Sequence, residues 1–148
     1  MLGSALGPNM SLTKLGLGGC KLHDEGVRAI LRPLRGPCSL QSLELQRNHI
    51  TAHGASAVSA FLAGSPRAGG PSRIAHLDLS HNSVGDLGIS LLSNSLCEAA
   101  ALRSLILQDC DIGVAGAAQT LLICRERDAA AVANIITAAC APWMLFIV

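Results

Sequence analysis

The sequence predicts an α/β solenoid, a single domain in which very short strands alternate with helices. Three observations predict it: an apolar, strand-like frame recurs four times, its copies are nearly evenly spaced, and each copy is followed by apolar residues at helical spacing. The frames start at residues 12, 40, 74 and 102, so successive starts lie 28, 34 and 28 residues apart. A chain of 148 residues is one domain by size, and the repeats leave no room for a second.

The clearest frame is the segment from Leu40 to Ile50, Leu-Gln-Ser-Leu-Glu-Leu-Gln-Arg-Asn-His-Ile. Apolar and polar residues alternate within it, which predicts a strand of three or four residues with one buried face. Such a strand is stable only beside others of the same kind, and the copies are at 12–22, 74–84 and 102–112. The longer interval contains the turn-forming run 63–72, which indicates a six-residue loop insertion.

The segments between the frames are expected to be helices. Four residues beyond the last apolar position of each frame stands a glycine: Gly26, Gly54, Gly88 and Gly116. Apolar residues then stand four apart, which places each pair on one helix face. The pairs are Ile30 with Leu34, Val58 with Leu62, and Leu92 with Leu96. In the fourth unit the same positions hold Thr120 and Cys124, so that unit is degenerate.

The frames match the pattern LxxLxLxx(N/C)xL, with Cys20, Asn48, Asn82 and Cys110 in the ninth position. In this pattern the chain resembles the leucine-rich repeats, and within them the ribonuclease-inhibitor-like class, whose repeat is about 28 residues long with a full helix. The resemblance covers residues 12 to about 122. It implies a right-handed solenoid with parallel strands on the concave face and helices on the convex face.

The ninth position of the frame is expected to be structural, because the chain leaves the strand there and must turn. Backbone groups inside that turn cannot reach water, and a side-chain amide can both donate hydrogen bonds to them and accept from them. This predicts backbone hydrogen bonds for Asn48 and Asn82. The thiols of Cys20 and Cys110 are expected to make weaker versions of these contacts in a tight space.

Composition argues against several classes of function. A net charge of +1, two phenylalanines, one tryptophan and no tyrosine provide neither the basic surface nor the stacking platforms of a nucleic-acid-binding protein. The chain has no G-x-S-x-G or Walker motif, so neither an enzyme, a small-molecule substrate nor a cofactor is expected. His49 and His53 stand four apart, but no acid or cysteine nearby completes a zinc site, so no metal is expected.

The six cysteines show no CxxC spacing. Cys20 and Cys110 occupy repeat positions three units apart, which is too far for a disulfide. A reduced, cytoplasmic and monomeric protein is the simplest interpretation.

The two ends depart from the repeats, which are assigned to residues 12–128. Residues 1–11 match the helical tail of a preceding repeat whose strand half is missing, which predicts a fragment or short form of a longer protein. Residues 129–148 are twenty residues without a charge. Three interpretations stay open for them: a degenerate last repeat or run-off sequence, a membrane anchor, or an unstructured tail.

The frame also predicts a binding surface. Its third, fifth, seventh and eighth positions point to the inner wall and stack from one repeat to the next. The resulting strip is polar and of mixed charge, which fits a protein partner best, while each single position is also typical of an ordinary solvated side chain. The candidate binding residues are Lys14, Glu44, Gln46, Arg47, His76, Asp78, Ser80, His81, Gln108 and Asp109.

The resemblance implies a non-catalytic protein-interaction module or scaffold. The alternatives are a regulator of a GTPase, the sensor end of a NOD-like receptor, and a membrane adaptor tethered by residues 129–148. Tight ribonuclease inhibition is not expected, because it would require a longer horseshoe with a strongly acidic inner face. On the outer wall, Arg28, Arg32 and Arg35 form a stripe at helical spacing, which is interpreted as a solvated helix face.

Overall fold

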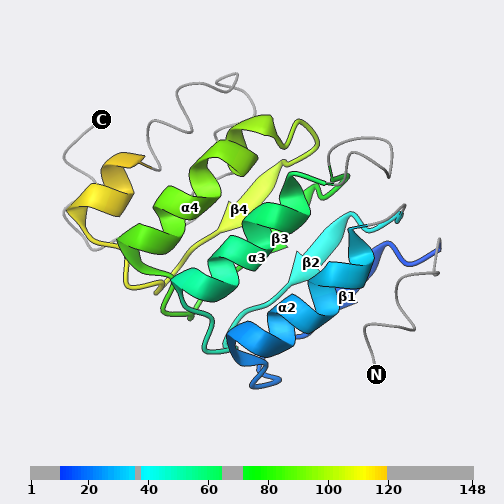
Figure 1. Cartoon of the computed structure of the whole chain (residues 1–148), viewed down its shortest axis with the longest axis horizontal. Helices are drawn as coiled ribbons and strands as arrows, with labels where there is room; N and C mark the ends of the chain where they lie inside the picture. The colour runs from blue at the N-terminus through cyan, green and yellow to red at the C-terminus, as the bar shows by residue number, and fades with distance from the viewer. Residues whose placement is uncertain (1–10, 36–37, 65–71, 120–148) are drawn as a thin grey trace.

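The structure, a computed structural model, describes residues 11–35, 38–64 and 72–119. Strands and helices alternate along them (Figure 1). The elements are β1 (Lys14–Gly16), α2 (His23–Leu34), β2 (Ser42–Glu44), α3 (Ala52–Leu62), β3 (His76–Asp78), α4 (Gly85–Glu98) and β4 (Ser104–Ile106), and a short helical segment follows at 114–119.

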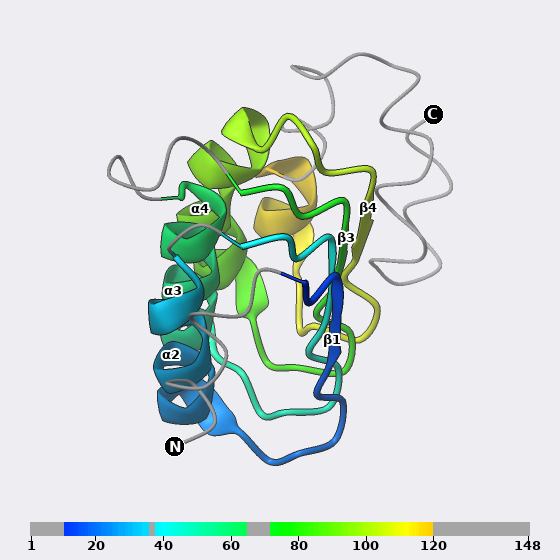
Figure 2. The ribbon, with the colours of Figure 1, turned by 90° about the vertical axis from the view of Figure 1, so that its right-hand side faces the viewer.

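The four strands form one parallel sheet in the order β1-β2-β3-β4. Equivalent frame positions are aligned across it: Leu15 pairs with Leu43, Leu43 with Leu77, and Leu77 with Leu105. The strands form one wall of the molecule and the helices the other (Figure 2). The predicted right-handed α/β solenoid, with parallel strands on the concave face and helices on the convex face, is confirmed.

The core lies between the two walls and is almost entirely aliphatic. The apolar frame positions of the second, third and fourth repeats are buried, with the exception of the half-buried Ile112. All six helix residues predicted to share a face are at most 6% exposed, so their predicted inward orientation is confirmed. In the first repeat, Leu12, Leu15, Leu17 and Leu22 are only partly buried, because β1 has a single neighbouring strand within the described residues.

The recurring glycines bring consecutive repeats close together. A side-chain Cβ at Gly88 would lie 2.5 Å from Cγ1 of Val84 and 3.3 Å from Cβ of Ala55. At Gly54, a Cβ would lie 2.5 Å from Oδ1 of Asp24 in the preceding repeat. The glycines are therefore needed for close packing at the helix starts, which explains why they recur.

Asn48 and Asn82 both satisfy backbone groups at the turn after the strand, as predicted. Asn82 Oδ1 accepts from the N–H groups of Asn48 (2.9 Å) and Ile50 (3.0 Å) in the preceding repeat. Its Nδ2 donates to the carbonyls of Leu45, Leu79 and Ser80 at 2.8–3.2 Å. Asn48 makes the equivalent donor contacts one repeat earlier. These side chains connect adjacent repeats where the sheet ends.

The two cysteines in the ninth position behave differently from each other. Cys110 is buried, and its thiol donates to the carbonyl of Leu79 at 3.1 Å, as expected. Burial raises the pKa of this thiol to about 11. Cys20 bears out the expectation only in part: its thiol donates to the Gly18 carbonyl at 3.7 Å, a weak counterpart of the contact from Asn48 to the Gln46 carbonyl, but its side chain is exposed and does not lie in a tight space. Within the described residues no repeat lies before β1 to enclose it.

An unexpected inter-repeat contact starts α3. The carboxylate of Asp24, in the first turn of α2, accepts hydrogen bonds from Thr51 N–H (2.8 Å), Thr51 Oγ1 (2.7 Å) and Gly54 N–H (3.0 Å). These backbone groups have no partner within their own helix, so an acid from the neighbouring repeat caps it. Asp86 repeats the arrangement by accepting from Gly113 N–H at 2.7 Å.

We expect Asp24→Ala to lower the free energy of unfolding by about 0.5–2 kcal/mol at pH 7, as for the loss of a helix cap. Burial by itself would raise the pKa of Asp24, but the hydrogen bonds from Thr51 and Gly54 together hold it below its usual range. Because its pKa is lower in the folded chain than in the unfolded chain, the Asp24 carboxylate stabilises the fold at pH values above the unfolded-state pKa of about 3.9. This stabilisation is lost as the pH falls through the folded-state pKa. In urea titrations carried out at pH values from 7 to 3, the free energy of unfolding of the wild-type protein should approach that of the variant as the pH falls. A constant difference over this range would contradict the assignment.

The predictions for the two ends concern residues 1–10 and 120–148, which lie outside the described residues. The proposed anchor at 129–148, the last residues of the repeat assignment (120–128) and the degenerate positions Thr120 and Cys124 all fall there. Among the residues that the structure describes, no helix is long and apolar enough to cross a membrane.

Candidate protein-binding surface

The sheet register places the predicted binding residues in columns along the strand wall. Lys14, Ser42, His76 and Ser104 form the third-position column, and Gly16, Glu44, Asp78 and Ile106 form the fifth-position column. Backbone hydrogen bonds continue the alignment beyond the strands, from Gly19 N–H to the Gln46 carbonyl (2.8 Å) and from His81 N–H to the Gln108 carbonyl (2.7 Å). The stacking predicted from the frame is therefore present.

The first charged contact on this wall joins neighbouring repeats. Lys14 Nζ lies 2.6 Å from Glu44 Oε1, and the lysine side chain is 63% exposed. The pair crosses the position of Gly16, where an added Cβ would lie 3.3 Å from the other glutamate oxygen. The glutamate side chain is only 25% exposed, so the pair is open to solvent mainly on the lysine side. Lys14 is therefore accessible to a partner, and Glu44 is accessible in part.

Ser80 differs from the expected surface residue. It is only 6% exposed, and its hydroxyl and N–H both donate to Asp78 Oδ1, at 2.6 and 2.9 Å. The serine therefore orients the Asp78 carboxylate and does not offer a free hydroxyl of its own. The binding candidate at this point of the wall is Asp78.

The eighth-position column lies at a sharp backbone turn. Gly19, Arg47, His81 and Asp109 all have positive φ angles, between 50° and 69°. Side-chain-bearing residues rarely adopt this conformation, and here the hydrogen bonds between repeats hold it in place. The column also contains a polar contact, because His81 Nδ1 lies 3.1 Å from Asp109 Oδ2. Arg47 has no ion-pair partner among the described residues.

A shallow hollow of about 480 Å³ opens where these columns meet. Its lining residues come from three consecutive repeats: Gly18, Gly19, Gln46, Arg47, Ser80 and His81. The glycines of the first repeat leave the space, and Gln46 occupies part of it, since a Cβ at Gly18 would lie 2.7 Å from Gln46 Cδ. Gln46 Oε1 is buried without a hydrogen-bond partner in the described part of the chain. The hollow thus presents a cation and an imidazole, and the unsatisfied amide oxygen is buried beside them.

The structure therefore brings together most of the predicted residues. Lys14 pairs with Glu44, and Gln46, Arg47 and His81 share the hollow. His76 and Gln108 lie on the same wall but have no side-chain ion pair or hydrogen bond with other described residues. The inter-repeat caps Asp24 and Asp86 were not predicted. The available signal was an acid two residues after the last apolar frame position, present in the first and third repeats only.

Comparison with known proteins agrees with this architecture. The family model described as "Leucine Rich repeat" matches residues 9–31, 36–59, 74–93 and 101–118, more than half of the chain. The chain belongs to the leucine-rich repeat family. Such domains generally serve as protein-interaction modules, and the relatives found are mostly non-catalytic binding proteins.

The curated relatives include proteins with NACHT, LRR and PYD domains and a ribonuclease inhibitor. The chain is 39% identical over 112 residues to "NACHT, LRR and PYD domains-containing protein 5" of Homo sapiens, covering 75% of the chain and 8% of the relative. It is 35% identical over 116 residues to "Ribonuclease inhibitor" of Sus scrofa, covering 77% and 24%. The chain thus spans less than a quarter of the length of either relative.

A solved structure shows the same fold at low sequence identity. "Leiomodin-1 Actin-Binding Site 2 (ABS2)" superposes with a TM-score of 0.64 at 16% identity, covering 80% of this chain and 65% of that one. This similarity supports the solenoid fold and nothing more specific.

Proposed function

We propose that this chain is a non-catalytic interaction module that binds a protein partner on its strand wall. The observation that supports it best is the set of polar side chains aligned across repeats: Lys14 with Glu44, the oriented Asp78, and His81 with Asp109. These groups contribute little to the core, whose stability comes from the aliphatic residues behind the sheet. They remain available for charge pairing with another protein.

The mixed signs of these groups favour a protein over a polyanion. Lys14 and Arg47 stand among Glu44, Asp78 and Asp109, so a uniformly charged ligand would meet repulsion at several positions. A protein surface can place opposite charges against each of them. The open hollow beside Arg47 and His81 would accept one side chain of the partner.

Proximity labelling with the full chain tests this proposal. The binding variant carries Glu44→Ala, Arg47→Ala and Asp78→Asn, and the asparagine keeps an acceptor for Ser80. The control carries Ser90→Ala, Asn94→Ala and Glu98→Ala on the exposed face of α4. Proteins enriched by the wild-type chain should fall about tenfold with the binding variant and stay unchanged with the control, because a few central residues dominate interface affinity. Equal enrichment by all three chains, with matching melting curves, would refute the assignment of the strand wall.

The relatives favour one more specific role. The match to a human protein with NACHT, LRR and PYD domains supports the use of this module as the recognition region of a receptor-type protein. The strand wall would then bind the activating protein. A bait carrying the same triple substitution within such a longer protein should lose the same partners, and retention of them would count against this role.

A further inference from the structure

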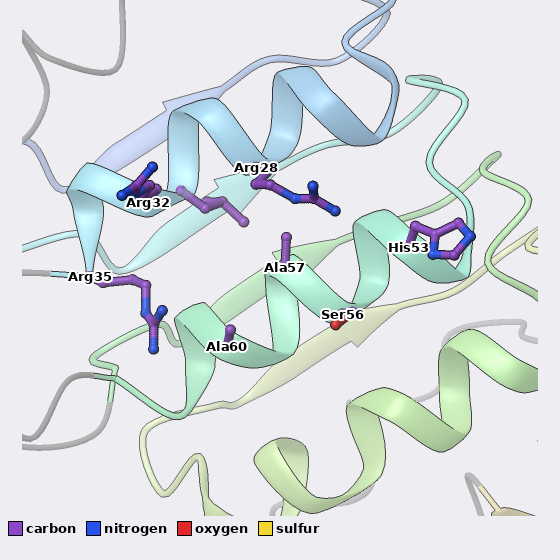
Figure 3. Close-up of a pocket in the computed structure, with 8 residues that line it drawn as sticks. Arg28, Arg32, Arg35, His53, Ser56, Ala57 and Ala60 are labelled. Carbon is purple, nitrogen blue, oxygen red and sulfur yellow. The ribbon is translucent and has the colours of Figure 1, made fainter.

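The outer wall contains a second recess, between α2 and α3 and away from the strand wall (Figure 3). It has a volume of about 370 Å³. One side is formed by Arg28, Leu31 and Arg32 of α2 with its C-cap residue Arg35, and the other by His53, Ser56, Ala57 and Ala60 of α3. Four of these eight residues are basic or imidazole side chains and none is acidic. We call this recess the arginine groove.

The small residues of α3 create the groove. Figure 3 shows Arg28 reaching from α2, and Arg35 from the C-cap position after it, toward α3, where Ala57 and Ala60 have short side chains. Arg28, Arg32 and Arg35 stand at i, i+4 and i+7, so they lie along one side of the helix over about 10 Å. The stripe that the sequence suggested as a solvated face is therefore one edge of a recess.

The positive charge of the groove is only slightly compensated. Arg28 Nη1 lies 3.3 Å from Glu25 Oε1, but both side chains are more than half exposed, so solvent weakens this pair. Arg32 and Arg35 have no side-chain ion pair with any other described residue. Two guanidinium groups therefore keep their full capacity for bidentate hydrogen bonds to carboxylates.

We propose that the arginine groove binds an acidic amphipathic helix of a protein partner. Carboxylates spaced at i, i+4 and i+7 on such a helix would face the three guanidinium groups, and small apolar residues between them would pack on Ala57 and Ala60. A recess with a small apolar floor fits a rod-shaped ligand better than a flat anionic membrane, which requires protruding cations. This site lies on the opposite wall from the proposed strand-wall surface and does not depend on it.

The test uses a fluorescein-labelled helical peptide with glutamates at i, i+4 and i+7 on an alanine background, titrated with the purified full chain in fluorescence anisotropy. The double variant Arg32→Glu/Arg35→Glu should weaken its Kd at least about tenfold. The control Arg73→Glu/Arg103→Glu, which reverses two exposed arginines away from the groove, should change Kd less than about twofold. Ala60→Leu fills the floor without changing charge and should also weaken binding.

Three outcomes would overturn the proposal. The first is equal binding of the peptide by wild-type and double-variant chains that have matching circular dichroism spectra. The second is equal affinity for a peptide of the same composition with its glutamates at i, i+2 and i+9. This result would show that binding depends on net charge and not on the spacing of the carboxylates. The third is binding to phosphatidylserine vesicles without binding to the peptide, which would make the groove a membrane contact.

Discussion

Asn82→Ala should lower the free energy of unfolding by about 3–5 kcal/mol, the largest effect expected for any polar substitution considered. The substitution removes five hydrogen bonds from a side chain that is 3% exposed. It leaves the N–H groups of Asn48 and Ile50 without an acceptor in the interior, and each buried group left in that state costs about 1–3 kcal/mol. Urea unfolding followed by circular dichroism measures the change.

Asn94→Ala is the matched control, because Asn94 is the same residue type on the exposed face of α4. Its loss should stay within about 0.5 kcal/mol. Asn82→Cys should fall between the two, since Cys110 in the equivalent place still donates to a carbonyl of the preceding repeat but accepts poorly. If Asn82→Ala and Asn94→Ala gave equal losses, the connection between repeats would not depend on the amide.

The features that sequence predicted well are those that repeat within a single unit. Leu43 and Leu45 belong to a frame whose period can be read along the chain, and stacking of equal units then fixes both register and core. The helix pairs, such as Val58 with Leu62, followed from the same logic. In these cases each residue packs against the equivalent residue of the neighbouring repeat, so its position can be predicted from the repeat period alone.

The features that sequence missed depend on contacts between different positions of neighbouring repeats. Asp24 caps a helix by reaching groups 27 and 30 residues further along the chain, and the acid that does so is present in only two of the four repeats. Cys20 occupies the correct frame position but lacks a described repeat before it. Ser80 appeared equivalent to Gln46, yet its short side chain turns to Asp78 and is buried.

On the candidate surfaces too, some features could be predicted from the sequence and others could not. The column to which each strand-wall residue belongs was predictable, because it follows from the register. The pairing of Lys14 with Glu44 was not, since it depends on the rotamers of two long side chains and on the space that Gly16 leaves beside the Glu44 carboxylate. Likewise, the arginine stripe was visible in the sequence, but the recess beside it depends on Ala57 and Ala60 of a different repeat. The binding role of the strand wall stays a prediction.

We expect stability and partner binding to depend on different residues in this chain. Leu77→Ala tests the residues that determine stability. Leu77 is 0% exposed and lies in β3, between Leu43 and Leu105 on the two neighbouring strands. Truncation removes buried methyl groups and leaves a cavity. Because β3 is hydrogen-bonded to β2 and β4, it cannot move to close this cavity. We therefore expect a loss of about 2–5 kcal/mol in urea unfolding.

The chain offers two leucines that make this prediction specific. Leu87 in α4 is 66% exposed, so Leu87→Ala should change stability by no more than about 0.5 kcal/mol. Leu15 holds the same register position as Leu77 but is only partly buried, so Leu15→Ala should give an intermediate loss. Glu44→Ala should cost little stability while weakening partner binding. Comparable losses for Leu77→Ala and Glu44→Ala would mean that the strand wall stabilises the solenoid itself, leaving no reason to assign its polar residues to a partner.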